Sequence, residues 1–154
     1  MGGTTVTTES TIIRVDRSYF PPCPIGKPVH HKMWYRGPEQ YDLAKTVLWL
    51  HPGQKKGGQV STGIIYDEQR DVGYLSRCLN LQDAKAIQEK GIETFRKFFK
   101  GKSLLLWKAV VKPPGGQMLA VPCLSEHCGA LLIDWIYFEF ALGGNAITLH
   151  LPTR

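Results

Sequence analysis

The chain has 154 residues, of which 43% are hydrophobic and 21% charged, and this composition excludes an intrinsically disordered protein or a collagen-like repeat. The length fits one folded domain at residues 11–154, preceded by a flexible tail at 1–10 that is rich in threonine, glycine and serine. No apolar segment reaches the roughly 18 residues of a membrane-spanning helix, because Asp134 and Glu139 interrupt the best candidate. We therefore expect no membrane partner.

The charge is unevenly distributed along the chain. Nineteen basic and thirteen acidic residues give a net charge of +6. The segments between Asp16 and Glu39 and between Glu93 and Glu126 contain basic residues but no acid. This pattern predicts an anionic partner such as RNA, DNA or a nucleotide, whereas the alternative is that the basic side chains only keep the domain soluble.

In the first half of the chain the pattern predicts short strands joined by loops. The segment at 20–31 has four prolines, which exclude a helix or a central strand and indicate a structured loop. Apolar residues on both sides of the polar turn at 67–71 predict a hairpin. The strands expected in this half are 11–15, 45–51, 60–66 and 72–75, and the apolar run within 45–51 predicts that this strand is buried.

A helix is predicted from residue 81 to about residue 100. Asn80 is a candidate N-cap, and Asp83 in the first turn suits the helix dipole. Apolar residues then recur at steps of three and four, through Ile87 and Gly91 to Phe95.

The second half of the chain predicts further strands. A loop at 123–128 is expected before the longest strand, and a Gly-Gly-Asn turn at 143–145 is expected to pair the last strand with that one. Short turns join antiparallel strands. The fold class is therefore α+β, a mainly antiparallel β-sheet of hairpins packed around or on one principal helix, at about residues 81–100. The strands expected in this half are 103–111, 118–121, 130–141 and 146–151.

Positive charge and aromatic rings occur together at 30–36, where the sequence is His-His-Lys-Met-Trp-Tyr-Arg. Rings beside cations are typical of sites for single-stranded nucleic acid or nucleotides. The alternative is that Trp34 and Tyr35 anchor a long loop onto the core. With cations from two other basic segments, the predicted ligand-binding residues are His30, His31, Lys32, Trp34, Tyr35, Arg36, Lys55, Lys56, Arg96, Lys97 and Lys100.

The four cysteines have no secretory context, since the N-terminus lacks the basic and apolar regions of a signal peptide. We expect reduced thiols and a cytoplasmic location. Cys123, His127 and Cys128 could supply zinc ligands, and Cys23 with His30 or His31 could complete the site. Against zinc, the chain has no C-x-x-C pair, and the cysteines could simply pack as small apolar residues.

A thiol enzyme is a second hypothesis. Cys128 would be the nucleophile, and the base would be a histidine other than the adjacent His127, namely His30, His31, His51 or His150. No nucleotide-cofactor motif is present, because the glycine-rich stretch at 53–58 lacks the closing Lys-Ser or Lys-Thr of a phosphate-binding loop.

Three functions therefore follow from the sequence. The first is a small, basic, non-enzymatic binding module for an anionic partner. The second is a small cytosolic enzyme with a Cys/His site between the loops at 20–31 and 123–128. The third is a protein-interaction or inhibitor module that uses an exposed sheet edge and aromatic loops, where a second copy of the chain could also bind.

Overall fold

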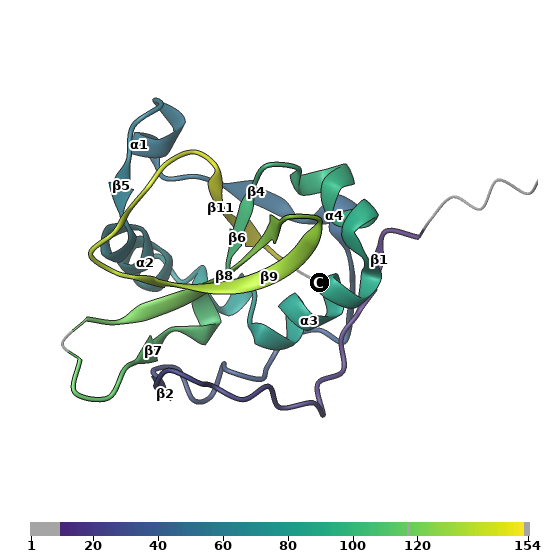
Figure 1. Cartoon of the computed structure of the whole chain (residues 1–154), viewed down its shortest axis with the longest axis horizontal. Coiled ribbons are helices and arrows are strands. Elements are labelled where there is room, and N and C mark those ends of the chain that lie inside the picture. Colours follow the sequence, from purple (N-terminus) through teal and green to yellow (C-terminus); the bar gives the residue numbers. More distant parts are fainter. Residues whose placement is uncertain (1–9, 117, 153–154) are drawn as a thin grey trace, which may run out of the picture.

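The computed structural model of the chain describes residues 10–116 and 118–152 (Figure 1). The tail predicted at residues 1–10 lies outside these ranges except for Ser10. The helical elements are η1 (Leu43–Lys45), α1 (Pro52–Lys55), α2 (Thr62–Asp71), η2 (Leu75–Arg77), α3 (Leu81–Lys90), α4 (Ile92–Phe99) and η3 (Trp107–Ala109), where η marks a 3-10 helix. None of the helices in the described ranges has the length and apolar character needed to cross a lipid bilayer.

The main sheet is mostly antiparallel and is built around β8. The strands are β1 (Ile12–Arg14), β2 (Lys27–Pro28), β3 (Gln40–Asp42), β4 (Val47–Trp49), β5 (Val60–Ser61), β6 (Ser103–Leu105), β7 (Val111–Lys112), β8 (Ala120–His127), β9 (Ala130–Tyr137), β10 (Ala141–Leu142) and β11 (Ala146–His150). β9 pairs with β8 along its whole length, while β6 and β7 also pair with β8. β2 continues the sheet beyond β7, and β11 and β4 continue it beyond β6. The α+β class with a mainly antiparallel sheet is confirmed.

Helices cover both faces of this sheet. Successive residues of a strand point to opposite faces, so one strand contributes side chains to two separate cores. In β8, Ala120 and Leu124 face a core that includes α3 and α4, while Val121 and Cys123 face a second core that includes α2. Ile133 of β9 packs against the first core. The layers in Figure 1 follow from this alternation, with α2 on one side of the β8–β9 hairpin and α3 and α4 on the other.

The helix predicted at 81–100 is present but divided at Gly91. Its start is as predicted: the Asn80 side chain accepts a hydrogen bond from the Asp83 N–H at 3.0 Å, and the Asp83 side chain accepts one from the Asn80 N–H at 2.9 Å. Gly91 has φ 111° and ψ 162°, a backbone conformation that residues other than glycine rarely adopt. It ends α3, and α4 then begins with a new direction and buries Phe95.

Replacement of Gly91 with alanine is expected to lower the free energy of unfolding by about 1–3 kcal/mol. A Cβ at this position would meet no atom within 4 Å, so the loss comes from backbone strain rather than from a clash. Gly143→Ala is the matched control, because Gly143 also has open space but has an ordinary φ. The control should change stability by less than about 0.5 kcal/mol in urea denaturation. Equal losses in the two variants would contradict the assignment.

The hairpin predicted over 60–75 is wrong, because Thr62–Asp71 forms helix α2. The run Ile64-Ile65-Tyr66 favours a strand by local propensity. The helix forms instead because it buries Ile65 and Tyr66 in the second core, where the Tyr66 ring lies 6.1 Å from that of Trp107. The Ser61 hydroxyl caps the helix by accepting a hydrogen bond from the Ile64 N–H at 3.3 Å.

Three further segments differ from the prediction. β4 is an edge strand with Val47 and Leu48 about half exposed, and not a buried one. The predicted loop at 123–128 is wrong, because β8 continues through His127. The last strand, β11, pairs with β4 and β6 instead of returning to β9. The outer edge of β9 is therefore left without a neighbouring strand in the described part of the chain.

Candidate functional site

The cationic residues predicted as a site lie in separate parts of the molecule. Lys55 and Lys56 are exposed at α1, and Lys97 and Lys100 are exposed at α4. Figure 1 shows α1 and α4 at opposite ends of the upper side, while the chain after β2, which contains residues 30–36, runs along the lower edge. The structure does not gather these three groups into one concavity.

Two cations of the basic segments are engaged by other groups of the protein, Arg96 near the surface and Lys108 in the interior. The Arg96 guanidinium contacts the Glu126 carboxylate, with Nε 3.0 Å from Oε1 and Nη2 2.5 Å from Oε2. This hydrogen bonding raises the pKa of Arg96 and lowers that of Glu126. Lys108 is buried and donates to the Arg36 carbonyl oxygen at 3.0 Å. Both groups stabilise the fold, and neither is free to hold a ligand.

The aromatic residues of the predicted binding segment anchor it to the protein. Trp34 is only 1% exposed and belongs to the core that includes α3, so in this structure its ring is covered and does not offer a face to a ligand. Tyr35 is half-buried and packs edge-on against Trp34 and Phe20. The alternative weighed in the sequence, that these rings fix a long loop, is what the structure shows.

The other members of the segment differ in their exposure. His30 contacts the Tyr66 hydroxyl through Nε2, and burial, followed by the charge of Arg70, lowers the pKa of His30. It is therefore a weaker cation than predicted. The remaining members are exposed and form no ion pair within the described ranges: His31, Lys32 and Arg36.

All four cysteines lie in the described ranges and are free thiols. Cys23 packs against the first core and Cys123 lies in the second, while Cys128 is exposed in the turn after β8. Across residues 10–116 and 118–152, no three His, Cys, Asp or Glu side chains are arranged to hold a metal ion. Cys23, Cys123, His127 and Cys128 therefore do not form the zinc site considered from the sequence, because the fold separates them.

The buried cysteines are also poorly suited to the thiol enzyme considered from the sequence. Burial raises the pKa of Cys123 to about 11 and that of Cys78 to about 12, so both thiols stay protonated at neutral pH. A protonated thiol is a poor nucleophile. Cys128 is exposed, but its neighbour His127 directs Nε2 toward other residues.

His127 contacts a serine and an aspartate without forming a catalytic triad. Its Nε2 lies 3.0 Å from the Ser125 hydroxyl and 2.8 Å from the Asp134 carboxylate. A triad needs the serine and the acid on opposite nitrogens of the imidazole, so that one nitrogen accepts a proton while the other is held by the acid. Here both partners contact the same nitrogen, which excludes that relay in this geometry.

The histidines at 51 and 150 are held by α2. His51 Nδ1 caps α1 by accepting from the Gly53 N–H at 3.0 Å, and its Nε2 lies 3.3 Å from Glu68. His150 is buried, with Nε2 2.6 Å from the Gln69 side-chain oxygen. Their contacts tie β4 and β11 to α2, as expected of structural histidines.

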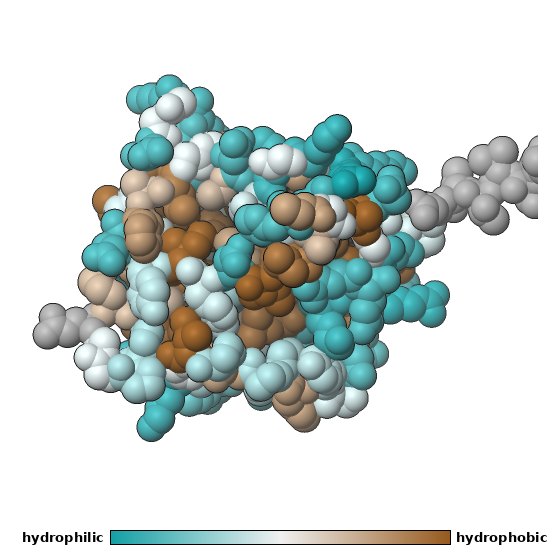
Figure 2. Space-filling view, in the orientation of Figure 1, coloured by the Kyte–Doolittle hydropathy of each residue, from teal (hydrophilic) through white to brown (hydrophobic). Residues whose placement is uncertain are grey.

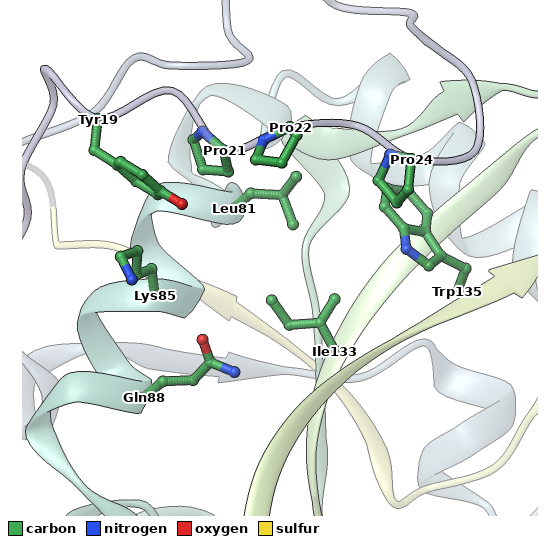
Figure 3. A pocket seen from close by; sticks show the side chains of 9 residues that line it. All are labelled: Tyr19, Pro21, Pro22, Pro24, Leu81, Lys85, Gln88, Ile133 and Trp135. Carbon is green, nitrogen blue, oxygen red and sulfur yellow. The ribbon is translucent and has the colours of Figure 1, made fainter.

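A cavity of about 300 Å³ lies between the proline-rich loop, α3 and β9 (Figure 3). Figure 3 shows Tyr19 and Lys85 on one side of it and Trp135 with Pro24 on the other. Figure 2 shows apolar side chains gathered where β9 crosses this face, with hydrophilic ones over α3 beside them. The cavity is lined by Tyr19, Pro21, Pro22, Pro24, Leu81, Lys85, Gln88, Ile133 and Trp135.

The proline-rich wall of the cavity is fixed at several points. The Gln82 side-chain amide donates to the carbonyl oxygens of Tyr19 at 2.6 Å and of Arg17 at 3.1 Å. Gln82 is buried, so these hydrogen bonds are shielded from water. The Tyr35 hydroxyl donates to the Pro21 carbonyl oxygen at 3.4 Å. Prolines add stiffness because their φ is fixed, and the wall is therefore preformed.

The β9 side of the cavity presents unpaired backbone groups. The Leu131 carbonyl points away from β8, because it accepts a hydrogen bond from the Gln88 side chain of α3 at 2.9 Å. In an antiparallel strand this direction alternates, so Ile133 and Trp135 also direct their N–H and C=O outward. Pro122, which has no N–H, lies opposite Trp135, as this register requires. Within the described ranges the backbone groups of Ile133 and Trp135 have no hydrogen-bond partner.

Two polar side chains of α3 border the same cavity. Gln88 links α3 to β9 through its hydrogen bond to Leu131. The cavity and the adjoining outer edge of β9 together form a groove, called here the β9 groove. The Lys85 ammonium lies 5.0 Å from the centre of the Tyr19 ring and 3.4 Å from the Glu89 carboxylate. Because this ion pair is exposed, it is weak and leaves Lys85 able to contact a ligand.

None of the residues that line this cavity belongs to the site predicted from the sequence. Tyr19 lies in the first acid-free basic segment, and Trp135 lies in the strand predicted at 130–141. The signal was the face of 130–141 that combines Ile133 with Trp135, next to a loop rich in proline. The sequence does not show that β11 pairs with β4 and β6 instead of β9, because strand pairing depends on the whole sheet.

Comparison of the chain with protein-family models, with curated proteins and with solved structures gives no match.

Proposed function

We propose that the protein is a protein-interaction module that binds an extended polypeptide segment along the outer edge of β9. The segment would add as a further strand, with its backbone paired to Ile133 and Trp135. The observation that carries the proposal is the presence of unpaired N–H and C=O groups at these two positions, directly beside an apolar cavity. Backbone pairing supplies affinity in this mode, and the cavity supplies specificity.

The lining of the cavity favours an apolar or aromatic side chain of the partner. Trp135 and Tyr19 offer ring faces, and Pro22 and Pro24 offer rigid apolar surface. Aromatic residues in such positions often contribute much of the binding energy at protein interfaces. Residues of a bound strand alternate in direction, so one side chain would enter the cavity while its neighbours point elsewhere.

Charge favours a peptide with acidic residues next to the apolar one. The chain carries a net charge of +6, and Lys85 lies in the cavity wall. Complementary charge raises the association rate and excludes partners of the wrong sign. The anionic nucleic acid or nucleotide predicted from composition stays a prediction, as does the cytoplasmic location. The peptide ranks first because Trp34, Arg96 and Lys108 are all engaged within the fold.

Selection from a phage-displayed library of random peptides tests the proposal. Peptides that bind the wild-type chain are then synthesised and measured against Trp135→Ala, which should weaken binding at least about tenfold. Leu132→Ala is the matched control, because Leu132 is exposed on the opposite face of the same strand and should leave binding unchanged. Circular dichroism establishes that both variants are folded.

Methylated peptides separate strand addition from simple insertion of a side chain. Methylation of every second backbone nitrogen removes the N–H groups that would pair with β9, whereas methylation of the intervening nitrogens leaves them. Only the first series should lose binding. Equal tolerance of both series, failure to select any peptide that binds, or equal binding by Trp135→Ala would overturn the proposal.

A further inference from the structure

A second site candidate lies at the pairing of β2 with β7, apart from the β9 groove. Lys27 lies directly opposite Lys112 in this antiparallel pair. Directly opposite residues share a face of the sheet, with their Cβ atoms about 4.5–5.5 Å apart. Both lysines are exposed and line an open cavity of about 300 Å³ with Pro113, Pro114 and Gly115.

The backbone fixes this pairing, whatever the charges of the two lysines. A Cβ on Gly26 would lie 2.5 Å from the Lys112 carbonyl oxygen, so only glycine permits the close approach of the loop to β7. The Val29 N–H then bonds the Val110 carbonyl oxygen at 2.9 Å and extends the contact. The fold therefore confines the two lysines to neighbouring positions.

This juxtaposition is unfavourable without a counter-ion. Like charges directly opposite each other in a sheet are destabilising. Within residues 10–116 and 118–152, neither Lys27 nor Lys112 forms an ion pair with a carboxylate.

We infer that Lys27 and Lys112 form a binding site for a phosphate group. A phosphate dianion would neutralise both ammonium groups and accept hydrogen bonds from each, and lysine is a common phosphate ligand as a point charge. The phosphate could be free or carried by a nucleotide, because the two sources offer the same oxyanion. The site does not depend on the peptide groove, since it uses other strands and other residues.

Thermal unfolding of the wild type, Lys27→Gln and Lys112→Gln tests this inference. Without phosphate the variants should have the higher Tm, and with phosphate only the wild type should gain stability. In low-salt buffer without phosphate, each variant should have a Tm about 1–3 °C above that of the wild type, because it removes one of two like charges that face each other. Millimolar inorganic phosphate should raise Tm of the wild type and of neither variant. Lys56→Gln is the matched control: it removes an equal charge from an exposed lysine elsewhere and should respond to phosphate like the wild type.

Adenosine monophosphate, as a second arm, distinguishes the two sources. A response at lower concentration than for inorganic phosphate assigns a phosphate carried by a nucleotide, whereas an equal response assigns free phosphate. The inference is overturned if phosphate raises Tm of the lysine variants as much as that of the wild type, or if no phosphate compound shifts the wild type. It is also overturned if both variants lower Tm in the phosphate-free buffer.

Discussion

Replacement of Asp83 with alanine is expected to lower the free energy of unfolding by about 3–5 kcal/mol, because it breaks a buried ion pair and leaves its partner uncompensated. Asp83 is fully buried. Its carboxylate lies 2.9 Å from the Arg17 guanidinium and accepts hydrogen bonds from the Tyr41 hydroxyl and the Asn80 N–H, each at 2.9 Å. Without the carboxylate, the mostly covered Arg17 guanidinium and the buried Tyr41 hydroxyl would lose this acceptor.

This cluster also holds the wall of the candidate groove. Arg17 donates to the Pro38 carbonyl oxygen at 2.7 Å, and Gln82, next to Asp83 on α3, holds the backbone of Arg17 and Tyr19. We therefore expect Asp83→Ala to weaken peptide binding as well as stability. The loss of binding should exceed the fraction of unfolded protein, because the wall loosens in molecules that are still folded.

Urea denaturation at neutral pH measures the loss of stability, and Asp67→Ala is the control. Asp67 pairs with Arg70 at 3.2 Å, but both side chains are about half exposed, so this pair should contribute less than about 1 kcal/mol. A loss below about 1 kcal/mol for Asp83→Ala, or one no larger than that of Asp67→Ala, would contradict the role given to the buried cluster.

The second large effect is a loss of stability in mild acid through His150. Burial, with a smaller contribution from Arg77, lowers the pKa of His150 from 6.5 to about 4. The folded chain therefore binds this proton less readily than the unfolded chain. The stabilisation is complete above pH 6.5 and is lost as the pH falls toward about 4, with a total on the order of 3 kcal/mol.

The contacts of His150 explain why protonation is unfavourable. The ring lies 4.7 Å from Tyr74 and 6.2 Å from Trp49, measured between ring centres, and its Nε2 donates to Gln69 in the neutral form. No carboxylate contacts the ring within the described ranges. A proton would place a charge in this apolar setting without compensation.

Urea denaturation of the wild type and of His150→Gln, at neutral pH and at about pH 5, tests this effect. Glutamine keeps a donor for Gln69 but does not titrate, so the variant should lose less stability in acid than the wild type. His31→Gln, at an exposed histidine, is the matched control and should follow the wild type. If His150→Gln loses as much stability on acidification as the wild type, another group is responsible.

Local patterns predicted the fold class better than the candidate site. The helix at 81–100 was predictable because its cap and its apolar periodicity agree with its tertiary packing. α2 was not, because Ile64, Ile65 and Tyr66 have strand propensity, and the segment is helical because Ile65 and Tyr66 are buried in the second core. Charge and aromatic content drew attention to residues 30–36, but the rings of Trp34 and Tyr35 serve the packing of that loop.

The groove depends on relationships that are remote in the sequence. Its walls come from the proline-rich loop, α3 and β9, and its unpaired backbone exists only because β11 pairs with β4 and β6. The placement of Lys27 directly opposite Lys112 also depends on remote parts of the chain, since it follows from the register of two strands that are far apart in the sequence. Composition placed both lysines in basic segments but could not pair them.

Amide hydrogen exchange along β9, followed by NMR, tests the proposed function most directly. Leu132 and Asp134 direct their N–H groups toward β8, so these amides should exchange slowly in the free protein, while those of Ile133 and Trp135 exchange fast. Addition of a selected peptide should slow exchange at Ile133 and Trp135 and leave their neighbours unchanged. Fast exchange at Ile133 and Trp135 with the peptide bound, or protection of both in the free protein, would contradict a free edge that receives a strand.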